Sequence, residues 1–368
     1  MSSVLIKEIG KVITGNTPSK NNSGFYSSND IGFIKPDVIS DEKITYIETT
    51  NEFISEQARS KARIVKDNAV LITCIGIIGK ICIVKDGEYA FNQQINAIEP
   101  NERVSAEYLA YCLLYNKKRL SHIANAPVVP IINKTQFENF QINIIDKREE
   151  QNQIVEVLKR TSNVIDMCRK QISQFDTLIK SRFVEMFGDP EENPFKWDKI
   201  PLSDVIVTAN NGMTRRGNDE DGNIVMRLVE LQDGYIDYSN PNRIILKDNE
   251  KKKYLLNDKD FLFARVNGNP DNVGRCAVFH DIGEEVYHND HIIRVHFNED
   301  LLDGIFASSL LNSDYGKRQL KSQIKTSAGQ YTVSQDGIGA IVTILPPMDL
   351  QEQFADFVHQ VDKLKFEV

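Results

Sequence analysis

The longest regular hydrophobic pattern in the chain runs through residues 147–187, where apolar or small side chains recur every three or four positions. These side chains are Ile154, Leu158, Thr161, Ile165, Cys168, Ile172, Phe175, Ile179 and Met186. Steps of three and four form a heptad seam, and the segment has no glycine or proline, so it predicts one helix of about 40 residues. Gly188 and Pro190 then end the helix.

A seam of this length has to be buried against a partner. Residues 348–368 offer Phe354, Val358, Val361 and Val368 at heptad-compatible spacing, which predicts an antiparallel pair of helices that acts as a coiled-coil spacer. The second helix is much shorter than the first, so part of the seam is left for another subunit or a second copy of the chain. The alternative is a first helix buried along the flank of one globular domain.

Shorter apolar runs outside the helices repeat in the same order in the two halves of the chain. Residues 90–114 match residues 287–311, and each segment predicts a strand, a polar turn and a helix. Residues 70–84 match 261–279, predicting two strands around a glycine-bearing loop, and 132–158 match 332–358. Gly15 and Gly212 occupy equivalent positions. A repeat this long is a duplicated domain, because solenoid units have only about 20–50 residues.

These patterns predict an α+β chain with two similar globular domains separated by long helices. The expected boundaries are residues 1–146 for the first domain, 147–187 for the long helix, 188–347 for the second domain and 348–368 for the short helix.

Composition favours a cytoplasmic protein. No apolar stretch approaches the ~20 residues that span a membrane, and the first residues lack a signal-peptide core. The five cysteines are scattered, without a Cys-x-x-Cys pair, and are interpreted as buried free thiols: Cys74, Cys82, Cys112, Cys168 and Cys276.

The net charge of −8 argues weakly against a chain that wraps nucleic acid by itself. The sequence nevertheless contains clusters of lysine and arginine. Most clusters of this kind are ordinary protein surface in contact with water. The clusters in this sequence are residues 117–119, residues 251–253, and the group Lys317, Arg318, Lys321 and Lys325.

The sequence contains only poor matches to known catalytic motifs. Residues 193–196 do not match a methyltransferase Asn-Pro-Pro-Tyr motif, and residues 76–80 are too short for a phosphate-binding loop. Asp37 and Asp41 are too close for the nuclease pattern they superficially suggest. His288 and His291 should point to opposite faces of a strand, so no metal site is expected there or at His296. A self-contained nuclease or methyltransferase is therefore a disfavoured alternative, and a coiled-coil scaffold that binds protein is another.

Four stretches resemble the specificity subunit of type I restriction–modification systems, and the resemblance covers essentially the whole chain. They are ITGNTPSKNN (13–22), IGFIKPDVI (31–39), FNQQINAI (91–98) and LIKSRFVEMFGDP (178–190). The resemblance implies a non-catalytic subunit in a bacterial or archaeal cytoplasm. Each globular domain would be a target recognition domain that reads one half of a bipartite site in double-stranded DNA.

The resemblance also implies partners. The helices would set the spacing between half-sites and dock two methyltransferase subunits, which carry S-adenosylmethionine, so no cofactor is expected on this chain. Restriction subunits would join that core. The residues of the long helix expected to contact partners are Ile154, Leu158, Ile165, Ile172, Phe175 and Ile179.

Polar loops at repeat-equivalent positions supply the side chains that DNA readout requires. Arginine pairs with guanine, asparagine and glutamine pair with adenine, and lysine binds phosphates. In the first domain the candidates are Asn16, Thr17, Ser19, Lys20, Lys80, Gln93 and Gln94. In the second they are Asn211, Thr214, Arg215, Arg216, Arg265, Asn267, Asn289, His291, Gln330 and Tyr331. Because the loops differ between copies, the two domains are expected to read different half-sites.

Overall fold

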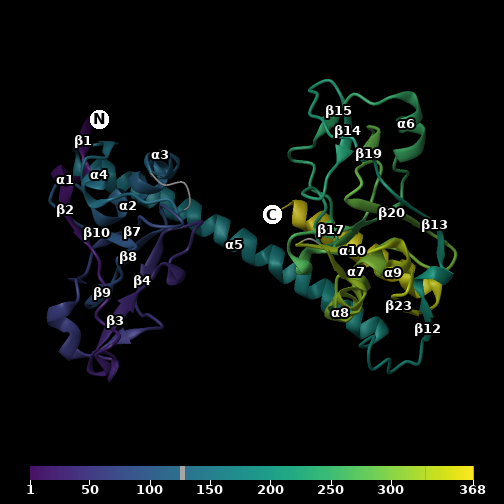
Figure 1. Cartoon of the computed structure of the whole chain (residues 1–368), viewed down its shortest axis with the longest axis horizontal. Coiled ribbons are helices and arrows are strands. Elements are labelled where there is room, and N and C mark those ends of the chain that lie inside the picture. The colour runs from purple at the N-terminus through teal and green to yellow at the C-terminus, as the bar shows by residue number, and fades with distance from the viewer. Residues whose placement is uncertain (125–128, 328, 368) are drawn as a thin grey trace. The chain divides into compact units, whose positions relative to one another are not determined.

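The computed structural model describes residues 1–124, 129–327 and 329–367. The chain divides into two compact units, Met1–Asp166 and Met167–Val368, which we call the first and second unit (Figure 1). Each unit combines sheets with helices, which confirms the predicted α+β class.

The first unit is built on a five-stranded sheet with the order β2-β10-β7-β8-β4 and a four-stranded sheet with the order β5-β3-β9-β6, while β1 pairs with β11. Its elements are β1 (Ser2–Leu5), α1 (Ile6–Ile9), β2 (Gly10–Thr14), β3 (Ile31–Ile34), β4 (Thr45–Ile47), β5 (Phe53–Ile54), β6 (Ile64–Val65), β7 (Val70–Thr73), β8 (Ile81–Val84), β9 (Tyr89–Phe91), β10 (Ile95–Pro100), α2 (Ala106–Tyr115), α3 (Lys117–Ile123), α4 (Lys134–Glu138), β11 (Gln141–Ile144) and the start of α5 (Arg148–Phe187).

The central strands β7 and β8 of the five-stranded sheet are apolar without alternation because both of their faces are buried. On β7, Val70 and Ile72 belong to the core that contains α2 and its Leu109. Leu71 lies in a second core on the other face, together with Ile34 of β3. Successive strand residues therefore serve two cores at once.

The second unit repeats this plan with a four-stranded sheet, β13-β20-β16-β18, and a three-stranded sheet, β15-β14-β19, while β12 pairs with β23. Its elements are β12 (Asp198–Pro201), β13 (Ile206–Asn211), β14 (Asn223–Met226), β15 (Arg243–Ile244), α6 (Asp248–Tyr254), β16 (Phe261–Ala264), β17 (Val266–Asn267), β18 (Cys276–Val278), β19 (Val286–His288), β20 (Ile292–Phe297), α7 (Gly304–Leu311), α8 (Asp314–Gln323), β21 (Lys325–Ser327), β22 (Gln330–Thr332), α9 (Gln335–Gly339), β23 (Val342–Leu345) and α10 (Met348–Phe366).

The predicted duplication is confirmed by strand pairing. The order β2-β10-β7-β8 recurs as β13-β20-β16-β18, and the parallel pair β3–β9 recurs as β14–β19. The units differ at their edges. The first unit adds β4 beside β8, whereas the second adds a small sheet with the order β17-β22-β21. The segment of the first unit that corresponds to the β21–β22 turn includes residues 125–128, which lie outside the described residues.

The helix predicted over residues 147–187 is α5, and α10 packs against it in antiparallel fashion within the second unit. Lys365 forms an ion pair with Asp176 at 2.8 Å, and Phe354 lies 5.5 Å, ring centre to ring centre, from both Phe183 and Phe187. These two phenylalanines of α5 are buried, although the predicted seam omitted them. Val368 of the predicted seam lies outside the described residues.

Phe183 and Phe187 were missed because they face the globular part of the unit as well as α10. Phe306 of α7 lies 4.8 Å from Phe187 and 5.5 Å from Phe183, measured between ring centres. Four phenylalanine rings therefore join two long helices to a globular core, an arrangement that a heptad pattern does not describe.

A fully buried glutamine fastens the first turn of each long helix to its unit. Gln151 of α5 accepts a hydrogen bond from the backbone N–H of Ser105 at 3.2 Å. Its amide nitrogen donates to the carbonyl groups of Arg103 and Ile145, both at 2.7 Å. The side chain thus ties α5 to the loop before α2 and to the end of β11.

Gln351 of α10 makes the same three bonds exactly one repeat later in the chain. It accepts from the N–H of Asp303 at 2.9 Å and donates to the carbonyl groups of Leu301 at 3.1 Å and Pro346 at 2.8 Å. Both glutamines use their amide oxygen and their amide nitrogen, so neither buries an unpaired side-chain polar atom of its own.

His288 is the fully buried histidine at the end of β19. Its Nδ1 lies 3.1 Å from the carbonyl oxygen of Tyr254, and its own carbonyl accepts from the N–H of Met213 at 2.9 Å. Burial lowers the pKa of His288 to about 4, so the ring is neutral at physiological pH. His291 lies in the turn before β20 rather than on the same strand.

We predict that Gln351→Ala lowers the free energy of unfolding of the second unit by ~2–4 kcal/mol, because it leaves buried backbone groups unpaired. Urea unfolding followed by the fluorescence of Trp197, the only tryptophan of the chain, measures this change. Gln353→Ala removes an exposed amide from the same helix turn and should change the free energy by less than ~0.5 kcal/mol. Equal effects of the two variants would show that the buried amide does not fasten α10.

We also predict that the second unit loses about 2 kcal/mol of stability between pH 7.5 and pH 5.0 through His288 alone. In the unfolded chain this histidine has its ordinary pKa of about 6.5, so over this pH range the unfolded state binds a proton that the folded state does not. His288→Gln should remove that part of the pH dependence, and His359→Gln, at an exposed position on α10, should preserve it. The measurement is urea unfolding at both pH values, and an unaltered pH dependence in His288→Gln contradicts the prediction.

Candidate nucleic-acid interface

In each unit, the first strand of the main sheet runs into a glycine that touches another loop backbone to backbone. A Cβ atom on Gly15 would lie 2.1 Å from the carbonyl oxygen of Asn92. A Cβ atom on Gly212 would lie 2.3 Å from the carbonyl oxygen of Asn289. No side chain fits at either position, which is why the glycine appears in both copies.

In the first unit this contact gathers several of the predicted DNA-binding residues. Thr17 donates to the side-chain oxygen of Gln93 at 2.7 Å. The N–H of Gln94 donates to the side-chain oxygen of Asn92 at 3.1 Å, which shapes the turn. Lys80 lies apart from them and donates to a backbone carbonyl on a neighbouring loop at 3.1 Å.

The remaining candidates of the first unit divide into one supporting residue and two exposed ones. Asn16 donates to the carbonyl of Lys61 at 2.6 Å and accepts from the N–H of Arg63 at 2.7 Å. Its amide therefore holds two loops together. Ser19 and Lys20 are exposed, and so remain available to a ligand.

The second unit gathers its candidates around the equivalent turn. Asn289 is buried, and its side-chain oxygen accepts from the N–H of His291 at 3.1 Å, as Asn92 does in the first unit. Arg216 binds the carboxylate of Asp290 at 2.6 Å and lies 3.2 Å from the Nε2 atom of His291. Arg265 donates to the carbonyl of Asp290 at 3.1 Å. Side chains from three loops therefore meet at one place.

Arg215 is held by a carboxylate of its own unit. Its guanidinium makes two bonds to Glu250, at 3.0 and 2.8 Å, and a third to the carbonyl of Ile245 at 2.7 Å. The hydrogen bonds from Arg215 lower the pKa of Glu250 to about 2, and Glu250 raises the pKa of Arg215. Contact with guanine would require this bidentate pair to open. The neighbouring Thr214 is exposed.

The small sheet β17-β22-β21 of the second unit carries the last three candidates. Asn267 of β17 pairs with Tyr331 of β22, and its side-chain oxygen accepts from the N–H of Asn269 at 2.9 Å. Gln330 is exposed at the start of β22. The sheet lies next to Arg265, because β17 begins at Val266.

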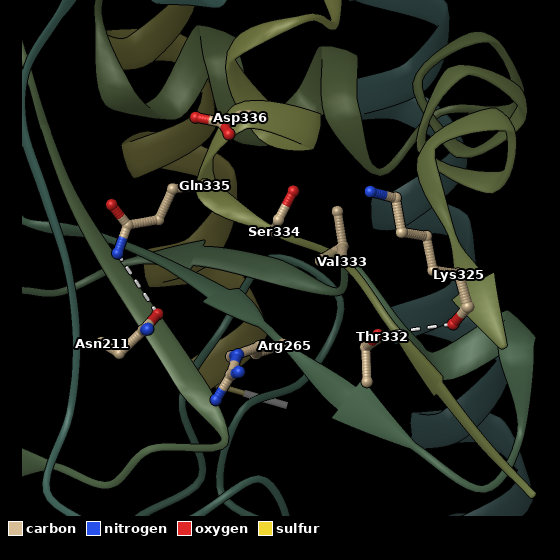
Figure 2. A pocket seen from close by; sticks show the side chains of 8 residues that line it. All are labelled: Asn211, Arg265, Lys325, Thr332, Val333, Ser334, Gln335 and Asp336. Atoms are coloured by element: carbon tan, nitrogen blue, oxygen red, sulfur yellow. Dashed lines mark hydrogen bonds between the residues drawn. The ribbon is translucent and has the colours of Figure 1, made fainter. Parts of the chain in front are cut away.

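A cavity of about 310 Å³ opens between this small sheet and the end of β13 (Figure 2). Its lining residues are Asn211, Arg265, Lys325, Thr332, Val333, Ser334, Gln335 and Asp336. Two of them, Asn211 and Arg265, are among the residues that were predicted to bind DNA. Ser334 and Gln335 were not predicted, and Lys325 was predicted only as part of a basic cluster. The polar run at residues 332–337, which opens the repeat segment 332–358, is the signal that could have found them.

Several cations of the basic clusters are neutralised within their own unit, as expected for solvated faces. Lys117 pairs with Asp41 at 2.8 Å, and Lys317 pairs with Asp233 at 2.7 Å. Arg318 pairs with Glu191, and Lys321 pairs with Asp271 at 2.7 Å. These pairs reduce the positive charge available to an anionic ligand.

The cysteines do not form a reactive site. Cys74, Cys82 and Cys276 are buried as expected, while Cys112 and Cys168 are half-buried. Burial raises the pKa of Cys74 to about 12 and that of Cys112 to about 11, so both are thiols at neutral pH. Within residues 1–124, 129–327 and 329–367, no group of three or more His, Cys, Asp or Glu side chains is arranged to hold a metal ion. None of the helices in these ranges is both long and apolar enough to cross a membrane.

The residues of α5 expected to contact partners fall into two groups. Ile154 packs on the core of the first unit and Ile179 on the core of the second, so both have an internal role. Leu158, Ile165 and Ile172 are 36%, 47% and 38% exposed, and Phe175 is half-buried. Val157, Val164 and Met167 are also exposed on this helix, which adds apolar surface that the seam had not included.

Both halves of the chain are similar to one known protein family. A family model described as "Type I restriction modification DNA specificity domain" matches residues 1–175 and again residues 194–368. The two matches correspond to the two copies of the repeat.

Similar proteins of known type cover much of the chain. The type I restriction enzyme StySPI specificity subunit of Salmonella potsdam is 26% identical over 291 residues, which are 75% of this chain and 62% of that protein. The type I restriction enzyme MjaVIII specificity subunit of Methanocaldococcus jannaschii is 24% identical over 356 residues, 90% of this chain and 83% of that protein. The chain thus spans less than two thirds of the StySPI relative.

A solved structure shares the fold. The S subunit of a type I restriction–modification system from M. genitalium superposes with a TM-score of 0.53 at 14% sequence identity. The match covers 100% of this chain and 90% of that chain.

Proposed function

Because the chain belongs to the type I restriction–modification DNA specificity family, we propose that it is the DNA-reading subunit of such a system. Each unit reads one half of a bipartite site in double-stranded DNA. The chain itself catalyses no reaction. Methyltransferase subunits that carry S-adenosylmethionine, and restriction subunits, supply the chemistry.

The observation that carries this proposal is a repeated frame with different loop side chains. The turn at Asn92 and the turn at Asn289 have the same hydrogen bond from the backbone N–H two residues on. Around that common turn, the first unit presents amides and a hydroxyl, whereas the second presents guanidinium groups and an imidazole. Two frames of one geometry with different polar side chains suit two half-sites of different sequence.

The boundaries of the recognition domains are part of the proposal. Residues 1–146 and 188–347 form the two DNA-reading domains, with the helices of residues 147–187 and 348–368 between and after them. α10 covers α5 between Asp176 and Phe187. The exposed residues Leu158, Ile165 and Ile172 then offer the surface for methyltransferase subunits, or for self-association of the chain.

We predict that binding of the full chain to duplex DNA weakens steeply with salt, because each phosphate contact releases counterions. With six or more contacts, affinity should fall by ~10³ or more between 50 and 200 mM salt. Fluorescence anisotropy with a labelled duplex measures this. A duplex that carries the recognised site should also bind more tightly than a random duplex of equal length. Weak salt dependence and equal binding to both duplexes would instead favour a protein-binding scaffold.

A further inference from the structure

The cavity at the end of β16 is lined by two cations that form no ion pair within the described part of the chain. Arg265 makes one side-chain hydrogen bond, to a backbone carbonyl, and Lys325 extends its ammonium group into the cavity (Figure 2). Within the described part of the chain, neither residue has a carboxylate at ion-pair distance. Arg215 and Arg216, by contrast, are each bound to a carboxylate.

Neutral hydrogen-bond donors complete the lining. The oxygen of Asn211 accepts from the amide of Gln335 at 3.3 Å, which leaves the amide nitrogen of Asn211 free to donate. The hydroxyl oxygen of Ser334 accepts from the N–H of Gly337 at 3.1 Å, so its own hydrogen can be donated elsewhere. Asp336 adds one negative charge at the rim, and its exposed carboxylate lies at the top of Figure 2. Two cations and two neutral donors therefore outweigh a single anion.

We propose that this cavity binds a phosphate group of the DNA backbone, an inference that rests on the proposed DNA-reading function. A guanidinium and an ammonium group that line one cavity match the charge and the acceptor oxygens of a phosphodiester. A base edge is a poorer match, because it lies at the floor of a groove about 8.5 Å deep. Arg265 is half-buried in the wall of the cavity, so it meets the outermost part of a duplex, which is the phosphate.

Among the described residues, the first unit has no cation at the position equivalent to Arg265. Cys74 occupies the position of Arg265, since its N–H donates to Gln94 at 2.7 Å just as that of Arg265 donates to His291 at 2.7 Å. The Cys74 side chain is buried and accepts a hydrogen bond from Asn96 at 3.2 Å. A neutral thiol replaces the guanidinium, so the contact proposed for Arg265 has no counterpart at Cys74 of the first unit.

The test compares salt dependence in matched variants of the full chain. The double variant Arg265→Gln and Lys325→Gln should bind duplex DNA about tenfold more weakly at 0.1 M salt, and the slope of log affinity against log salt should flatten by about 1. The preference for the recognised site over other sequences should stay as in the wild type. Lys259→Gln removes one charge at the opposite end of β16, where Lys259 pairs with Glu299, and should leave the slope unchanged.

Each other outcome has a defined meaning. A double variant with the wild-type slope and affinity overturns the phosphate assignment, provided that its unfolding curve matches that of the wild type. A changed sequence preference with an unchanged slope shows that these side chains read a base instead, which also overturns it. A wild-type chain whose DNA binding does not depend on salt defeats the proposed function itself, and the slope of the wild type distinguishes that failure from failure of the cavity proposal.

A second arm separates backbone phosphate from free phosphate. Isothermal titration calorimetry of the full chain with inorganic phosphate at constant ionic strength should detect no saturable binding at concentrations up to about 10 mM. The reason is that a few charged contacts to a small free anion give only weak affinity. Saturable binding that Arg265→Gln abolishes, without any change in the DNA slope, would identify a free-anion site and overturn the proposal.

Discussion

The rest of the structure depends on the buried glutamine in the first turn of each long helix. Gln151 and Gln351 each satisfy one N–H and two carbonyl groups that would otherwise be buried unpaired. Because all three bonds go to backbone, they fix the direction of the helix relative to the strands and loops that it contacts, without constraining the surrounding side chains. Each recognition unit is therefore fixed to a helix by the same geometry, whatever its loops contain. A protein that must present variable loops on a constant spacer requires such an attachment.

The two units use their polar loops in different ways. Around the turn at Asn92, amides and hydroxyls bond to each other. Around the turn at Asn289, arginines bond to carboxylates, as in the pair between Arg215 and Glu250. Internal pairing of this kind keeps guanidinium groups ordered and lowers their availability, whereas Arg265 and Lys325 form no ion pair within the described residues and stay available to an anion.

Much of the fold could be predicted from the sequence, because its determinants are local or repeated. The heptad pattern predicted α5, and the duplication predicted that Gly15 and Gly212 share one environment. The role of Phe183 and Phe187 could not be predicted, because their partner rings come from segments more than 100 residues away in the chain. The candidate site was predicted by residue type alone, and whether these loops bind DNA stays a prediction. Residue type cannot show that the carboxylate of Glu250, 35 positions later, binds the guanidinium group of Arg215. It also cannot show that Ser334 and Gln335 line the same cavity as Arg265.

The central claim is that two separable units each read one half of a DNA site from a common frame. The most direct test replaces residues 1–146 with the corresponding domain of another family member and maps methylated adenines in cells that also carry the methyltransferase. The account predicts that one half of the methylated motif changes, while the other half and the spacing stay as in the wild type. A motif that changes in both halves, or one that does not change at all, would contradict it.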